Sequence, residues 1–76
     1  MIRDEDMELY NRVVESFRRY CERKGYIFQQ PSVDYSEISH FNNSKKPYSI
    51  IQLCNTNTVL VAYYLNHRTN KLQWIE

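Results

Sequence analysis

The single glycine of the chain, Gly25, separates two parts with different hydrophobic periods. Before it, apolar side chains recur at the three- and four-residue spacing of one helix face. After it, apolar residues alternate with polar ones or form short aromatic and β-branched runs, which favours strands. A chain of 76 residues with one such switch has room for one domain. We therefore expect residues 1–76 to form a single α+β domain.

The first part predicts one N-terminal amphipathic helix over residues 4–24. The acidic residues 4–6 lie at the positive end of the helix dipole, and Arg23 and Lys24 lie at its negative end. Gly25 then provides the glycine with which helices commonly end. The buried face of this helix is expected to consist of Met7, Tyr10, Val13, Val14, Phe17 and Cys21.

The second part predicts an antiparallel meander of three to five strands on which the helix packs. Turn-forming residues at 42–47, 55–57 and 66–70 separate the β-prone stretches. These connections are too short for the crossovers that parallel strands need. The expected strands are residues 26–30, 36–41, 48–54, 58–65 and 71–75, of which the second is irregular.

One helix can cover only one face of such a sheet. Both faces of the strand at 58–65 are apolar, because successive side chains point to opposite sides. The uncovered face is expected to be closed by curvature, covered by residues 32–47, or exposed as an interface. The two predicted faces of this strand are Val59, Val61, Tyr63 and Leu65 on one side, and Leu60, Ala62 and Tyr64 on the other.

The residue types argue against cofactor, metal and nucleophile chemistry. A phosphate-binding loop needs several glycines, and this chain has one, so we expect no small-molecule cofactor. Cys21, Cys54, His40 and His67 are too dispersed for the close ligand pairs of a zinc site. No helix N-terminus is aimed at Cys54 to lower the pKa of its thiol. We therefore expect a chain that is not an enzyme and has no catalytic residue.

The compartment expected from the sequence is the cytoplasm. The N-terminal residues are acidic and lack the apolar stretch of a signal peptide. The longest apolar run, Val59 to Leu65, is far shorter than the roughly 20 residues that span a bilayer, so no membrane partner is expected. In the reducing cytosol both cysteines are expected to be free thiols.

The order of a helix, a glycine and then strands leading to Ser39 and His40 resembles the small HicA-type toxins. That resemblance implies cleavage of RNA with one histidine, which would be His40. The chain departs from the family pattern, since no glycine directly precedes Ser39, the spacing from Gly25 is long, and the expected C-terminal helix is missing. A histidine acts as a general acid or base only on a substrate held against it. A small HicA-like ribonuclease is therefore the most remote alternative.

Nucleic-acid binding is a second alternative. Aromatic side chains on a sheet can stack bases, and basic residues in the neighbouring loops can neutralise phosphates. The formal net charge of +1 argues against a purely electrostatic nucleic-acid binder. The basic residues of the helix are interleaved with acids, which is typical of a solvated face. The residues concerned are the sheet tyrosines Tyr26, Tyr35, Tyr48, Tyr63 and Tyr64 and the basic residues Arg18, Arg19, Arg23, Lys24, Lys45, Lys46, Arg68 and Lys71.

The leading expectation is a small interaction or regulatory protein. It would bind a protein partner, or a second copy of itself as a homodimer or larger homo-oligomer, through an aromatic-rich sheet face. Tyrosine, tryptophan and arginine are the residues most often found at interface hot spots. Because Tyr63 and Tyr64 point to opposite faces, only one of them should bind, and the other is structural. The expected binding residues are Lys45, Lys46, Tyr48, Tyr63, Tyr64, Arg68 and Trp74.

Overall fold

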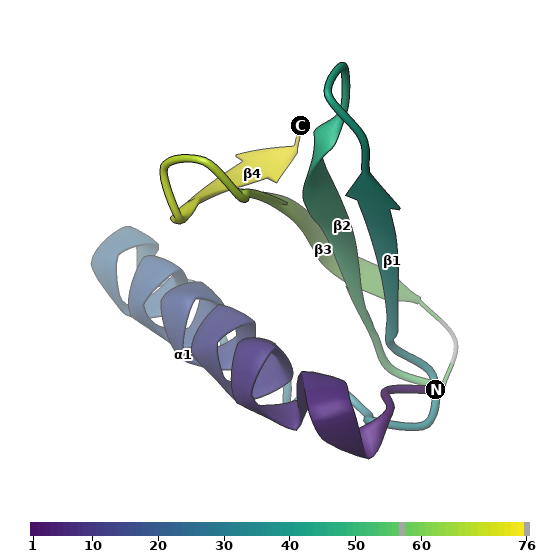
Figure 1. Ribbon diagram of the computed structural model, residues 1–76. Coiled ribbons are helices and arrows are strands. Elements are labelled where there is room, and N and C mark those ends of the chain that lie inside the picture. The colour runs from purple at the N-terminus through teal and green to yellow at the C-terminus, as the bar shows by residue number, and fades with distance from the viewer. Residues whose placement is uncertain (57, 76) are drawn as a thin grey trace.

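The computed structural model describes residues 1–56 and 58–75. A short 3₁₀ helix, η1 (Asp4–Asp6), leads into the helix α1 (Met7–Lys24). The strands of the described part are β1 (Glu37–Asn42), β2 (Pro47–Cys54), β3 (Val59–Asn66) and β4 (Lys71–Ile75). They form one antiparallel sheet in the order β1-β2-β3-β4, and α1 lies against one of its faces (Figure 1). The predicted α+β fold, one N-terminal helix on an antiparallel meander, is confirmed.

The helix ends where its sequence predicts. Gly25 adopts a left-handed conformation with φ of 73°, and its amide N–H points back to the carbonyl oxygens of Cys21 and Glu22. The residues of α1 that are buried recur every three or four positions, and they are Tyr10, Val13, Phe17 and Cys21. Within the described residues, neither helical segment combines the length and the apolarity needed to cross a bilayer.

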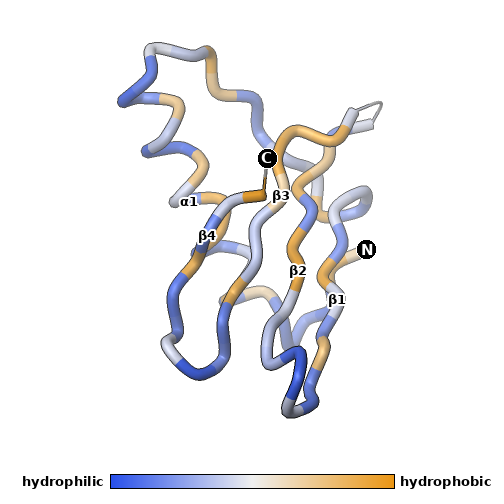
Figure 2. The backbone as a smooth tube through the Cα atoms, turned by 90° about the horizontal axis from the view of Figure 1, so that it is seen from above, coloured by the Kyte–Doolittle hydropathy of each residue, from blue (hydrophilic) through white to orange (hydrophobic). Residues whose placement is uncertain are grey.

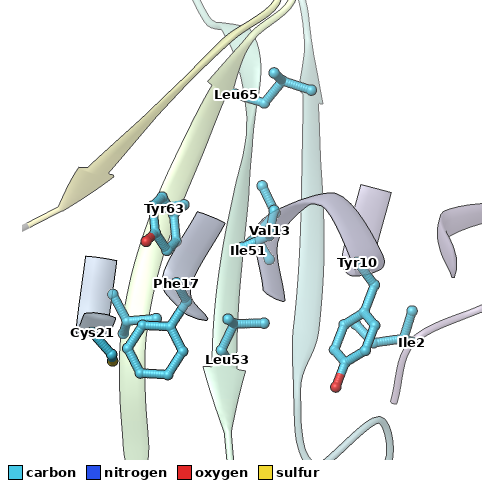
Figure 3. Close-up of a cluster of buried hydrophobic side chains, with 10 residues drawn as sticks. Ile2, Tyr10, Val13, Phe17, Cys21, Ile51, Leu53, Tyr63 and Leu65 are labelled. Atoms are coloured by element: carbon cyan, nitrogen blue, oxygen red, sulfur yellow. The ribbon is translucent and has the colours of Figure 1, made fainter. Parts of the chain in front are cut away.

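The core lies between α1 and the sheet face that we call the inner face. Alternate residues of β2 and β3 are buried there, as expected for strands with one covered side. Val13 of the helix and Ile51 and Leu53 of β2 have no measurable exposure to solvent. Figure 3 shows these side chains together with those of Phe17 and Tyr63. The opposite face, which we call the outer face, has no helix or other segment of the described residues lying over it in Figure 1.

The strand predicted at residues 26–30 is wrong. This segment has no regular secondary structure, and it runs back along the helix as part of the connection to β1. The N–H of Tyr26 donates to the carbonyl of Cys21, and the Phe28 ring lies 5.6 Å from that of Phe17. Further along, Pro31 accepts from the Tyr10 hydroxyl. Aromatic and β-branched residues predicted a strand here, but the aromatic rings of Tyr26 and Phe28 contact the helix instead.

A β-bulge changes the face assignment at the start of β3. The register shifts so that Leu53 pairs with Val61 while Cys54 pairs with Val59. The extra residue moves Leu60 toward the core and leaves Val59 51% exposed. The prediction that Val59 shares the face of Val61 is therefore wrong, and so is the placement of Leu60 on the opposite face.

Asparagines take the structural roles that glycines usually take in turns. Asn70 adopts a left-handed conformation with φ of 57° between β3 and β4. The side-chain oxygens of Asn43 and Asn66 accept backbone N–H groups two and three residues further on. Asn55 accepts the N–H of Thr58 in the same way. The third residue of the turn predicted at 55–57 lies outside the described residues.

We predict that the Gly25→Ala variant loses about 1–2 kcal/mol of unfolding free energy. No atom lies within 4 Å of the position that the new Cβ would occupy, so the loss comes from the left-handed backbone alone. Urea unfolding measures it. Gly25→Asn is the control and should lose less, because asparagine tolerates this conformation better. An alanine variant as stable as the parent protein would contradict the prediction.

Candidate functional site

The antiparallel register sorts the outer-face residues into three rows that run across the strands. Residues paired directly across neighbouring strands project from the same face, so each row is a set of side-chain neighbours. The first row lies nearest the turns that join β1 to β2 and β3 to β4. In order from β1 to β4, the rows are Phe41, Tyr48, Asn66, Lys71; Ser39, Ile50, Tyr64, Gln73; and Glu37, Gln52, Ala62, Ile75.

Three aromatic rings form a continuous cluster on this face, two from the first row (Phe41 and Tyr48) and one from the second (Tyr64). We call this cluster the aromatic row. The ring centroids of Phe41 and Tyr48 are 5.7 Å apart, and those of Tyr48 and Tyr64 are 5.9 Å apart. Both pairs are tilted, which is a favourable geometry for aromatic contacts. All three side chains are half-buried by one another and by the sheet. The aromatic row therefore presents a preassembled apolar surface to solvent.

An open depression lies beside the aromatic row. It is lined by Tyr48, Ile50, Tyr64 and Ile75 and encloses about 340 Å³. An apolar cavity of about 150 Å³ already accepts a benzene-sized molecule. The depression therefore has room for an apolar side chain of a partner.

Basic residues from a stretch of sequence without acidic residues gather at the turn end of the sheet. The Lys46 ammonium lies 5.9 Å from the centre of the Phe41 ring. Arg68, in the turn after β3, donates to the carbonyl of Ser44 at 3.1 Å, which brings the two turns together. Both turns are strongly hydrophilic in Figure 2. Lys45 and Lys71 complete this group, which we call the basic rim.

The net charge of the whole chain conceals this concentration. Residues 38–75 contain four basic and no acidic residues, whereas residues 1–37 contain six basic and eight acidic ones. Glu76 completes the total of +1. The acid-free stretch is the signal in the sequence that identifies the basic rim, and the overall charge does not reveal it.

The structure brings together five of the seven predicted binding residues and separates the other two from them. Tyr48 and Tyr64 belong to the aromatic row, and Lys45, Lys46 and Arg68 belong to the basic rim. Tyr63 is buried in the core, where burial raises the pKa of its hydroxyl. By the alternation rule its role is structural. Trp74 projects from the inner side of β4, with its ring centroid 4.2 Å from that of Tyr20.

Sequence reasoning missed three residues of this surface: Phe41, Ile50 and Ile75. Each becomes significant only through its partner on the next strand. Phe41 pairs with Tyr48, Ile50 with Tyr64, and Ile75 with Ala62. The alternation within each strand could have placed them on the outer face, but the register that joins them is a tertiary property.

A hydrogen-bonded chain on the inner face joins Asp6, His40, Ser49 and His67. His40 Nε2 lies 3.0 Å from Asp6 Oδ1, and His40 Nδ1 lies 2.5 Å from Ser49 Oγ. Ser49 Oγ also lies 3.0 Å from His67 Nε2. Asp, His and Ser in this order resemble a hydrolase triad, but Ser49 is fully buried and unavailable to a substrate. The chain instead ties η1, β1, β2 and the last turn together.

The same series of hydrogen bonds includes His40, the residue that the ribonuclease alternative requires. Both of its ring nitrogens have hydrogen-bond partners within the protein. One of these bonds would have to break before His40 could exchange a proton with a substrate. Cys21 is buried and Cys54 half-buried, and both are free thiols. Residues 1–56 and 58–75 contain no group of three His, Cys, Asp or Glu side chains placed to hold a metal ion.

Comparisons with known proteins do not add to this description. The chain matches no protein-family model, and searches of curated proteins and of solved structures return no similar protein.

We predict that Ser49→Ala lowers the unfolding free energy by about 1–2 kcal/mol, because both histidines lose a hydrogen bond to the hydroxyl. Urea unfolding measures the loss. Ser39→Ala is the matched control on the outer face of β1, and its effect should stay within about 0.5 kcal/mol. Equal losses in the two variants would contradict a structural role for the chain of hydrogen bonds.

Proposed function

We propose that the protein is a small, non-enzymatic interaction protein whose outer sheet face binds a protein partner. The observation that carries this proposal is the aromatic row beside an apolar depression, on a face that no other part of residues 1–56 and 58–75 covers. Contiguous exposed apolar surface on a small protein is typical of a binding site. Its position on a rigid sheet means that little conformational order has to be gained on binding.

The chemistry of the surface supports one class of protein partner. An apolar side chain fills the depression between Tyr64 and Ile75, and acidic side chains around it meet the basic rim. Burial of the aromatic rings supplies most of the affinity, because tyrosine is a frequent hot-spot residue. The exposed lysines contribute mainly to the rate and specificity of association. An acidic protein with one protruding apolar residue is therefore the best complement.

A second copy of the chain is the alternative protein partner. Among the described outer-face residues, Glu37 is the one acidic side chain that such a copy offers to the basic rim. A foreign acidic surface gives better charge complementarity. We therefore favour a different protein over self-association.

Photocrosslinking tests this proposal. We expect benzoylphenylalanine in place of Tyr64 to give one discrete covalent adduct when cells producing the protein are irradiated. The same group in place of Tyr35, which is 53% exposed on the connection before β1, serves as the control and should give none. The charge reversals Lys46→Glu and Arg68→Glu, made together, should reduce the adduct at least tenfold. Reversals at Arg3 and Lys24 should leave it unchanged.

The mass and composition of the adduct distinguish the alternatives. A protein adduct heavier than two copies of the chain supports the proposal, whereas an adduct of twice the chain mass identifies self-association. An adduct that a nuclease removes identifies nucleic acid on the outer face. Equal adducts from positions 64 and 35, or none from either, would contradict binding through this face.

A further inference from the structure

A second surface with different chemistry lies between α1 and β4, on the other side of β4 from the aromatic row. A hollow of about 600 Å³ is lined there by helix residues and by Leu72 of β4. Three of the lining residues are arginines, at positions 12, 19 and 23. At 100° per residue they share one narrow stripe of the helix, about 16 Å long. The hollow is therefore a groove with guanidinium groups along its length.

The positive charge of this groove is only partly compensated. Among its lining residues, Glu15 is the one acid, and its carboxylate accepts hydrogen bonds from both Arg18 and Arg19. The hydrogen bonds and charge of Arg18 lower the pKa of Glu15. This carboxylate therefore stays ionised and paired with Arg18 and Arg19. Arg12 donates to the side-chain and backbone oxygens of Asn70, which are neutral acceptors. The lining of the groove itself therefore holds three guanidinium groups and one carboxylate.

Aromatic side chains continue the groove at its C-terminal end. The Arg23 guanidinium lies 5.9 Å from the ring centre of Tyr20, which in turn contacts both Trp74 and Tyr26. Trp74 is 40% exposed and Tyr26 is 60% exposed. A second hollow, of about 400 Å³, is lined by these rings and by apolar residues. Positive charge and accessible aromatic rings are therefore adjacent on one flank of the molecule.

We propose that this flank site, defined by Arg12, Arg19, Arg23, Tyr26 and Trp74, binds single-stranded nucleic acid. The arginines bind successive phosphates, and unpaired bases stack on Trp74 and Tyr26. Guanidinium groups match phosphate with paired hydrogen bonds, and aromatic rings bind any base through its flat face. An acidic peptide satisfies the arginines but leaves the rings without stacking partners. The site uses none of the outer-face residues, so it is independent of the protein interface proposed above.

Trp74 provides a direct readout, because it is the only tryptophan of the chain. We expect short mixed-sequence single-stranded DNA or RNA to quench its fluorescence in a saturable way. The binding, followed in parallel by the anisotropy of a labelled strand, should weaken markedly between 50 and 200 mM salt. Polyglutamate of similar charge should quench little, since it has no bases to stack.

The variant Arg19→Gln with Arg23→Gln tests the binding of phosphates by the arginines. Both residues are exposed, so the fold should be retained, which circular dichroism checks. We expect affinity to fall at least tenfold and the salt slope to become shallower by about 1.4, at roughly 0.7 for each phosphate that the variant no longer neutralises. The control Lys45→Gln with Lys46→Gln removes the same charge from the basic rim and should change affinity less than threefold.

Three results would overturn the proposal. The first is the absence of Trp74 quenching at 50 mM salt with micromolar protein, and the second is equal quenching by polyglutamate. The third is equal weakening by both pairs of substitutions, which would mean diffuse attraction rather than a site. Failure of the flank site leaves the crosslinking from position 64 unaffected, so the two proposals can fail separately.

Discussion

The packing of α1 against Ile51 and Leu53 on the inner sheet face is the interaction on which the rest of the structure depends. These side chains and Val13 are the most completely buried apolar groups among the described residues, and each contributes about 1.5–3 kcal/mol through the hydrophobic effect. The described part of the chain has no second α-helix to cover the other face. The outer face is consequently left to solvent or to a partner.

The charged residues are also divided unevenly between the helical part and the sheet. The acidic residues lie on η1, α1 and the connection to β1, apart from Glu37 at the start of β1 and Glu76, while the sheet from residue 38 to residue 75 carries basic residues alone. On α1, Arg18 hydrogen-bonds to both Glu15 and Glu22. These carboxylates are therefore less available to neutralise the arginines that face β4. β4 thus separates two surfaces, one apolar with a basic rim and one rich in arginine. Each suits a different kind of partner.

Local patterns in the sequence were sufficient to predict most helices and strands, but they were insufficient to predict which of these elements contact one another. The spacing of apolar residues and the position of Gly25 predicted the helix, and asparagine-rich turns predicted the last three strands. The segment at 26–30 was predicted as a strand because aromatic and β-branched residues favour strands, but its aromatic rings contact α1. The bulge that turns Leu60 inward and the register that joins Phe41 to Tyr48 depend on contacts across the sheet. Those contacts also decide that Trp74 and Tyr64 lie on opposite faces.

The division of the sheet into a structural face and a binding face is tested most directly by adjacent tyrosines of one strand. Tyr63 is buried against the helix, whereas Tyr64 lies on the outer face and hydrogen-bonds to Gln73. Urea unfolding of Tyr63→Ala should show a loss of about 3–5 kcal/mol, the usual cost of removing a buried aromatic ring. Tyr64→Ala should lose about 1 kcal/mol or less. Equal losses at the two positions, or a larger loss at Tyr64, would contradict this division.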